Sequence, residues 1–158
     1  MHNNKQLPLR IGVGIILLNH ESKVFVGTRI DNPKNFWQMP QGGVHQNENF
    51  LQAAKRELEE ETGIKSVELI KKLDGWLEYD LPENLLGKVL EGKYRGQKQK
   101  WFIMKFTGNE EEINVKTKNP EFMDWKWIDA SKLTSIAVSF KVELYKKLHQ
   151  ELNFLNLN

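Results

Sequence analysis

Residues 42–64 read GGVHQNENFLQAAKRELEEETGI, in which two glycines and a polar loop lead into an amphipathic stretch. Asn47 is a candidate N-cap and Gly63 a candidate C-terminal stop, so the pattern predicts a helix over residues 48–61. Because successive helical side chains turn by about 100°, three glutamates share one face of this helix: Glu57, Glu60 and Glu61.

The remaining faces of the predicted helix differ in character. One is apolar and suited to packing: Leu51, Ala54 and Leu58. The other is polar: Gln52, Lys55 and Glu59. Three carboxylates on one face repel one another, and a divalent cation would relieve the repulsion. Oxygen ligands in a chain without cysteine suit Mg²⁺ or Mn²⁺, and the alternative is a solvated acidic helix face.

The spacing of glycine, glutamate and arginine in this stretch is similar to the Nudix box at every defining position. The matching residues are Gly42, Glu48, Arg56-Glu57-Leu58, Glu60-Glu61 and Gly63-Ile64. With glycine and glutamate each near ~7% of residues, a chance match has a probability on the order of 10⁻⁷. The resemblance therefore favours a catalytic carboxylate cluster over a solvated face.

Four further segments resemble the bacterial RNA pyrophosphohydrolase branch of the Nudix family, which is related to dinucleoside polyphosphate hydrolases. They are residues 37–43, 96–102, 120–122 and 138–141. The resemblance covers nearly the whole chain and implies a single domain over residues 1–158. It also implies an α/β fold, an α/β/α sandwich with a central mixed sheet and a loop-helix-loop catalytic motif.

The same resemblance implies which residues carry the chemistry. The metal is expected at Glu57, Glu60, Glu61, Glu121 and Gly42. Glu121 comes from a separate loop and is a further ligand or a base. One of the four glutamates is expected to take the proton of the attacking water, and the sequence leaves open which one.

Arg56 is expected to orient Glu57 and to pair with Glu48, a task that suits a bidentate guanidinium better than a lysine. The alternative for Glu48 is a simple negative charge at the helix N-terminus. Gly42, Glu48 and Gly63 are expected to have structural roles within the motif.

Substrate recognition is expected to involve residues outside the box. By resemblance, Arg10 and Phe140 would stack on a base, as single-stranded RNA is usually held, and Lys141 would contact a phosphate or base edge. The alternatives are a core position for Phe140 and a solvated charge for Lys141. The other expected substrate-binding residues are Arg29, Tyr79 and Val138.

Lys98 and Lys100 alternate with Gln97, Gln99 and Trp101, so both lysines are expected on one face of a strand. There they could hold phosphate in an open active site. The alternative is an ordinary edge strand protected by lysine.

Hydrophobic patterning predicts the other elements. Residues 10–18 have apolar side chains at both odd and even positions, which is typical of a central strand covered on both faces. Further strands are predicted at 23–29, 67–73, 76–81, 98–106 and 122–128, with a terminal helix from Ser139. Loops are predicted at 31–35 and 82–97, the second with or without a short helix.

Composition excludes several classes of protein. The chain has 158 residues, a net charge of +2 and no cysteine. Disulfides, thiolate zinc sites and thiol nucleophiles are therefore excluded, and affinity for polyanions must be local. The start of the chain lacks the apolar stretch of a signal peptide, which predicts a cytoplasmic protein with no membrane or DNA partner. Nothing in the sequence identifies a protein partner.

The function expected from the resemblance is removal of pyrophosphate from the 5′-triphosphate end of RNA, with Mg²⁺ as the most plausible cofactor and Mn²⁺ as another. The resulting 5′-monophosphate would favour RNA decay. Hydrolysis of dinucleoside polyphosphates is the alternative. A binding module without catalysis is the third hypothesis, and it predicts gaps among the box carboxylates, where none is missing.

Overall fold

The computed structural model describes residues 7–31 and 35–157, and most of the loop predicted at 31–35 lies outside these residues. Seven strands form one sheet in the order β4-β6-β1-β2-β7, with β3 paired to β1 and β5 to β6. The strands are β1 Leu9–Leu18, β2 Val24–Arg29, β3 Gln41–Gly43, β4 Val67–Lys72, β5 Leu77–Asp80, β6 Gly96–Phe106 and β7 Phe122–Ile128. The helices are α1 Phe50–Thr62, α2 Leu133–Ile136 and α3 Val142–Phe154.

The centre of the sheet is the parallel pair β1 and β6, in register from Leu9 opposite Gly96 to Leu18 opposite Lys105. The remaining pairings are antiparallel. The sheet is therefore mixed, as predicted, and β1 is its buried central strand.

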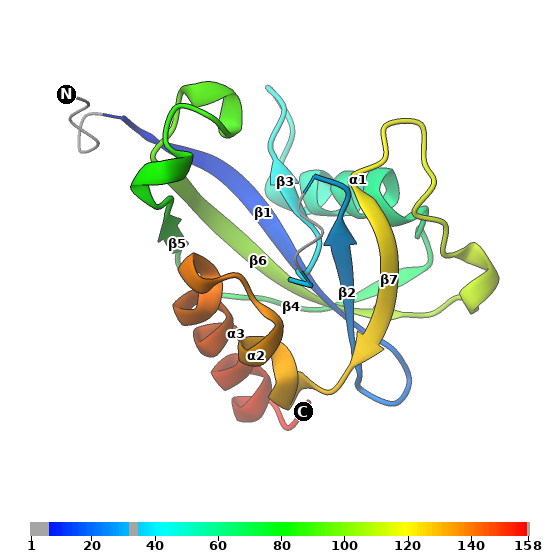
Figure 1. Ribbon diagram of the computed structural model, residues 1–158. Coiled ribbons are helices and arrows are strands. Elements are labelled where there is room, and N and C mark those ends of the chain that lie inside the picture. The colour runs from blue at the N-terminus through cyan, green and yellow to red at the C-terminus, as the bar shows by residue number, and fades with distance from the viewer. Residues whose placement is uncertain (1–6, 32–34, 158) are drawn as a thin grey trace.

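Two apolar clusters cover the two faces of the sheet because side chains alternate along β1 and β6. Val13, Ile15, Phe102 and Met104 pack with α1 on one face. The opposite face meets α2 and α3 through a second group: Ile16, Leu18, Trp101 and Ile103. The helices on both sides of the sheet (Figure 1) give the predicted α/β/α sandwich.

The opening between β1 and β2 positions the box. These two strands pair only where Leu18 meets Val24, and β3 instead pairs with Gly12 to Gly14 of β1. Met39, just before β3, donates its backbone N–H to the Tyr145 hydroxyl of α3 at 2.7 Å. The chain entering the box is thereby tied to the helix on the far face.

The boundaries of the box helix differ from the prediction. The N-cap of α1 is Asn49 rather than Asn47, because Asn49 and Gln52 form a reciprocal capping box. Asn47 lies in the preceding turn with φ of 66°. Gly63 ends the helix in the left-handed conformation at φ 76°, as predicted, and donates its N–H to the Glu59 carbonyl.

The C-terminal half contains short helical segments that the sequence left undefined. Residues 82–95 hold two 3₁₀ turns, Glu83–Leu85 and Leu90–Gly92. The terminal helix begins at Val142 rather than Ser139, because a 3₁₀ turn over Ser139–Lys141 precedes it.

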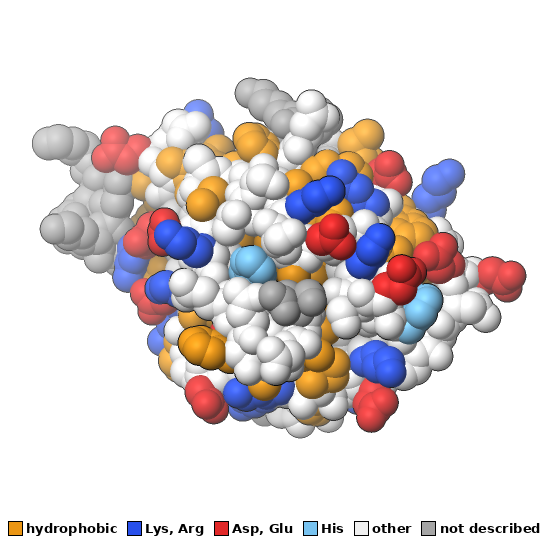
Figure 2. Space-filling view, turned by 90° about the horizontal axis from the view of Figure 1, so that it is seen from below, with side chains coloured by type: hydrophobic (Ala, Val, Ile, Leu, Met, Phe, Trp, Pro, Cys, Tyr) orange, Lys and Arg blue, Asp and Glu red, His pale blue; other side chains and the backbone are white. Residues whose placement is uncertain are grey.

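The molecular surface matches the nearly balanced charge of the chain. Acidic and basic side chains are interspersed over the face shown in Figure 2. Among the described residues, no helix has both the length and the apolar character needed to cross a membrane.

Candidate active site

Gly42 is the point where the sheet meets the box helix. A Cβ built on Gly42 would lie 2.0 Å from the Glu57 carboxyl carbon, a distance that no side chain can occupy. Any side chain at position 42 would therefore displace the Glu57 carboxylate, which rests directly on the backbone of β3. The contact fixes one predicted ligand against the rigid sheet.

Arg56 connects the loop, the helix and the carboxylates. Its Nε and Nη2 donate to the two oxygens of Glu48 at 2.8 and 3.0 Å, and Nη2 also donates to the Gly43 carbonyl at 2.8 Å. Nη1 donates to Glu57 at 2.9 Å and to Glu60 at 3.1 Å. The predicted pairing of Arg56 with Glu48 is thus present, together with a direct contact to Glu57.

Glu48 lies before the helix and not within its first turn. The Arg56 guanidinium and the His45 backbone N–H hold the pKa of Glu48 at about 2. The alternative of a simple helix N-terminal charge is wrong, because the carboxylate is used to bind Arg56 and to close the loop at His45.

Glu61 carries a buried carboxylate close to Glu121. Its side chain is 2% exposed, and neither carboxylate oxygen has a hydrogen-bond partner among the described residues. Burial raises its pKa well above the ordinary value, and the neighbouring Glu121 carboxylate adds to the effect. An unpaired buried carboxylate is costly, so a cation fits this position.

The other carboxylates surround Glu61 unequally. Burial raises the pKa of Glu57 against the opposing effect of Arg56, whereas the Glu60 side chain is 56% exposed. Glu121 lies just before β7, with its carboxylate 3.8 Å from Arg29 Nη1. Within the described ranges no three acidic or histidine side chains form a preassembled metal site. The donors nevertheless suit a hard divalent ion, which retains water and phosphate among its ligands.

Arg29 places a cation next to these carboxylates. Its Nε and Nη2 donate to the two carboxylate oxygens of Asp31, each at 2.8 Å, and this pair raises the pKa of Arg29. Sequence reasoning missed Asp31 because an exposed loop aspartate has no distinguishing pattern.

Lys141 lies on the α3 face of the sheet and is only 6% exposed. Its Nζ donates to Gln38 Oε1 at 3.3 Å and sits 5.3 Å from the Tyr79 ring centroid. Burial lowers the pKa of Lys141 to about 7, and the positive charge of Arg29 contributes. The alternative of a solvated helix charge is therefore wrong.

Tyr79 organises a buried polar network. Its hydroxyl accepts from Gln97 at 2.6 Å and from Gln41 at 3.2 Å, and Gln99 donates in turn to Gln41. The glutamines were missed as supporting residues because alternating Gln and Lys in β6 is also typical of an exposed strand.

Phe140 and Val138 complete this side of the site. The Phe140 ring is half-buried, packs against the core and lies 5.7 Å from the Tyr79 ring, centroid to centroid. Val138 accepts the backbone N–H of Lys141 at 2.9 Å. Phe140 thus has both an inner packing surface and an exposed surface, which is compatible with each of its two predicted roles.

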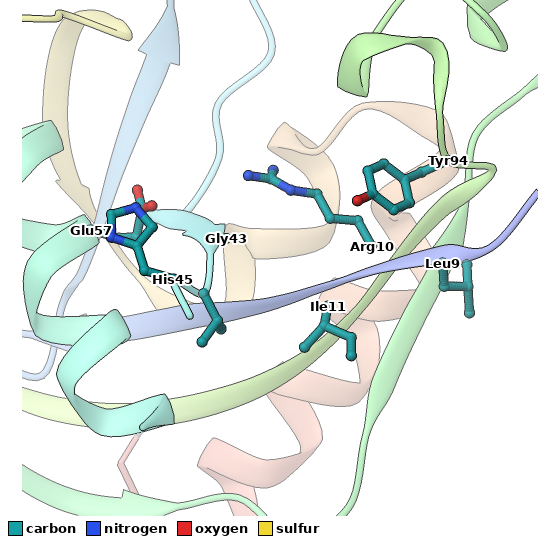
Figure 3. A pocket seen from close by; sticks show the side chains of 8 residues that line it. Leu9, Arg10, Ile11, Gly43, His45, Glu57 and Tyr94 are labelled. Atoms are coloured by element: carbon teal, nitrogen blue, oxygen red, sulfur yellow. The ribbon is translucent and has the colours of Figure 1, made fainter. Parts of the chain in front are cut away.

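A pocket opens between the start of β1 and the box loop (Figure 3). Arg10 and Tyr94 line one side of it, and His45 and Glu57 line the other. The Arg10 guanidinium covers Gly43 so closely that a Cβ there would lie 2.4 Å from Nη2. The structure therefore brings Arg10 to the carboxylates, and it adds Tyr94 and His45, which the sequence did not indicate.

The comparison with family models identifies this arrangement. A model described as the NUDIX domain matches residues 8–148. The chain belongs to the Nudix family. The Gly42 contact, the Arg56 hydrogen bonds and the buried Glu61 are thus features of a Nudix box on its expected scaffold.

Relatives of this Nudix protein cover almost its full length. An RNA pyrophosphohydrolase of Pelagibacter ubique (strain HTCC1062) is 60% identical over 96% of this chain and 96% of the relative. One from Bartonella henselae is 48% identical over 94% of this chain and 92% of the relative.

Solved structures with the same fold share much less sequence. The E. coli dihydroneopterin triphosphate pyrophosphohydrolase has a TM-score of 0.68 at 21% identity, over 92% of this chain and 99% of that chain. A C. elegans Ap4A hydrolase has a TM-score of 0.62 at 18% identity, over 90% and 98%. These similarities support the Nudix fold and carry no argument about substrate.

Lys98 and Lys100 lie elsewhere in this Nudix protein. They share one face of β6, as predicted, but it is the α1 face, and both ammonium groups lie over the Trp76 ring. The edge-strand alternative is wrong, because β6 is paired on both sides. The structure does not bring either lysine to the group around Tyr79 and Lys141.

Proposed function

We propose that this Nudix protein removes pyrophosphate from the 5′-triphosphate end of RNA and leaves a 5′-monophosphate. The observation that carries the proposal is the 60% identity, over 96% of both chains, to a relative named RNA pyrophosphohydrolase. The aromatic and cationic side chains beside the carboxylates support it, because RNA offers both bases to stack and phosphates to bind.

The carboxylates would hold a divalent cation, for which Mg²⁺ is the best candidate. Glu61 supports this assignment because its buried oxygens have no other partner among the described residues, and Glu57, Glu60 and Glu121 supply further oxygens. When bound, such an ion would neutralise charge on phosphate oxygens and acidify an attacking water.

The protein's own groups would position and neutralise the reactants. Arg56 holds Glu57 and Glu60 in place through two hydrogen bonds, and one glutamate takes the proton of the attacking water. Arg29 and Lys141 would bind the phosphate chain and offset the charge that develops on the leaving pyrophosphate.

The RNA bases would be held on the α3 side of the site. The exposed part of the Phe140 ring would stack on a base there, and the Tyr79 ring packs against Phe140. Arg10 lies across the pocket from Glu57 and would stack on a base or bind the first phosphate. A free nucleoside triphosphate lacks the downstream base and would be a poor substrate.

A direct comparison of substrates tests the proposal. With Mg²⁺, kcat/KM should be higher for a 5′-triphosphorylated RNA than for a dinucleoside tetraphosphate. A clear preference for the dinucleoside tetraphosphate would contradict the RNA proposal and leave the Nudix chemistry intact. Absence of turnover with either substrate would contradict both.

A further inference from the structure

Trp76 anchors a basic and aromatic surface on the α1 face of the sheet. The ammonium groups of Lys98 and Lys100 lie 4.9 and 4.4 Å from its ring centroid. The Phe50 ring meets Trp76 edge to face at 5.5 Å, and Lys72 lies 5.7 Å from the Phe50 centroid. These five residues are called the Trp76 surface below.

The Trp76 surface is held in place but left open to solvent. Lys98 and Lys100 lie on the same face of β6 with their ammonium groups over the indole, and Lys100 also donates to the Gly75 carbonyl at 3.2 Å. Trp76 remains 39% exposed. An ordered, exposed indole next to fixed cations is the combination used to bind single-stranded nucleic acid without sequence preference.

Charge on the surface favours a polyanion. Three lysines contribute to it, while Glu78 faces Lys98 across the β5–β6 pair and offsets one charge. The chain as a whole is only +2, so this local excess is not a consequence of overall composition.

The Trp76 surface is continuous with the active-site pocket. Ile11 lines that pocket together with Glu57, and Ile11 is also the direct neighbour of Lys98 across the β1–β6 pair. Ile11 is 47% exposed. Arg10 and Ile11 are adjacent in β1 and face opposite sides of the sheet, so the pocket they line is where an RNA could pass from the α3 side to the α1 side. An RNA that passes Ile11 there reaches Lys98 and Trp76 next.

We propose that the Trp76 surface binds the body of the RNA substrate, downstream of the nucleotides at the active site. One base would stack on the exposed part of Trp76, and Lys98 and Lys100 would contact the adjoining phosphates. This inference rests on the proposed RNA function and assigns the two lysines a place on the RNA path outside the catalytic centre.

Binding can be measured separately from catalysis with a 5′-hydroxyl RNA, which has no triphosphate. We would compare a single strand of about 12 nucleotides, within the usual range of site sizes, with one of about three, by fluorescence anisotropy without metal. The wild type should bind the longer strand more tightly. Trp76→Ala should weaken that binding by about 5- to 150-fold, with little effect on the shorter strand, and Trp76→Phe should retain most of the affinity.

The salt dependence tests the lysines. Each phosphate contact contributes about 0.7 to the slope of log Kd against log salt for single strands, so Lys98→Gln with Lys100→Gln should lower the slope by about 1.4. The matched control is Lys146→Gln with Lys147→Gln, which removes two exposed charges from α3 on the other side of the sheet. The control should leave the slope unchanged.

Several outcomes would overturn the proposal. These are equal affinity for both strand lengths, unchanged affinity in a folded Trp76→Ala variant, or equal slopes for the two lysine pairs. Hydrolysis of a 5′-triphosphorylated dinucleotide by the wild type tests the proposed function alone, so the two failures are distinguishable.

Discussion

Arg56→Lys is the sharpest test of how the box is assembled. The arginine makes five hydrogen bonds, to Glu48, Glu57, Glu60 and the Gly43 carbonyl. An ammonium group has three donors at one point, so at least two of these bonds are lost. Because the positive charge is retained, we take the lower end of the range for bonds to charged groups, about 1.5 kcal/mol each, and expect a loss of about 3 kcal/mol in the free energy of unfolding.

The effect on catalysis should exceed the effect on folding. A domain of this size has about 5–15 kcal/mol of stability, so the variant should fold, but Glu57 and Glu60 lose their common anchor. Misplaced supporting contacts typically cost ~10–100-fold in metal affinity or activity. The Mg²⁺ concentration for half-maximal activity should therefore rise, and kcat/KM should fall at fixed Mg²⁺.

The assays are urea unfolding and kcat/KM over a range of Mg²⁺ concentrations. Arg95→Lys is the matched control, since Arg95 forms a simple ion pair with the exposed Asp80, and such pairs contribute less than about 1 kcal/mol. If Arg56→Lys behaves like this control in stability and Mg²⁺ dependence, Arg56 does not position the carboxylates.

Three further predictions concern individual side chains. Glu61→Gln removes a buried carboxyl group that has no hydrogen-bond partner among the described residues and whose pKa is raised in the folded state. At pH 7 and without metal, the variant should therefore have a higher Tm than the wild type, and a lower Tm would contradict this. Mg²⁺ should no longer raise the Tm of the variant, and kcat should fall ~10²-fold. The pKa of Glu48 falls from 4.5 to about 2 on folding. The Glu48 carboxylate therefore stabilises the folded state fully above pH 4.5, and this stabilisation is lost as the pH falls from 4.5 to about 2. In urea unfolding between these pH values, the free energy of unfolding should decline less steeply for Glu48→Gln than for the wild type. Parallel declines in the two proteins would exclude the Glu48–Arg56 ion pair as the cause. Phe140→Ala should weaken RNA binding by about 1–3 kcal/mol. Its loss of folding stability should be smaller than the roughly 3–5 kcal/mol expected for a fully buried phenylalanine. The measurements are Tm and kcat/KM on RNA and on dinucleoside tetraphosphate, and unchanged Tm together with unchanged RNA activity would refute stacking.

The catalytic helix could be predicted from the sequence because its period is strict. Spacing alone puts the three glutamates on one face, and the burial of Glu57 and Glu61 agrees with it. The N-cap was misplaced because polar residues are adjacent at 46–49, and the partner Gln52 distinguishes Asn49 among them. Strand β3 escaped prediction because Gln-Gly-Gly has low strand propensity, and tertiary pairing with β1 forms it.

Residues of the proposed substrate-binding side were harder to place because the local sequence pattern does not show which face of a strand is buried. The alternation of Gln and Lys in β6 correctly predicts that the glutamines share one face of the strand and the lysines the other. It does not predict which of the two faces is buried. The structure shows Gln97 and Gln99 buried with Tyr79, while the intervening Lys98 lies over Trp76. The sequence shows which β6 side chains share a face. Which of the two faces lies against α3, and so near the proposed substrate site, depends on how the helices pack on the sheet.

The division of the site between distant chain segments has an evolutionary consequence. Glu57, Glu60 and Glu61 come from α1, whereas Phe140 and Lys141 belong to a 3₁₀ turn before α3. Among the described residues, the bonds that tie the segment before the box to the α3 side include those from Met39 to Tyr145 and from Lys141 to Gln38. In the proposed function Phe140 contacts a base and Lys141 contacts phosphate, so substitutions at Phe140, but not at Lys141, would change which molecule is accepted without disturbing bond cleavage. Because different chain segments would then determine bond cleavage and substrate choice, duplicated genes for such a protein could evolve toward new substrates through single substitutions while keeping the hydrolytic chemistry.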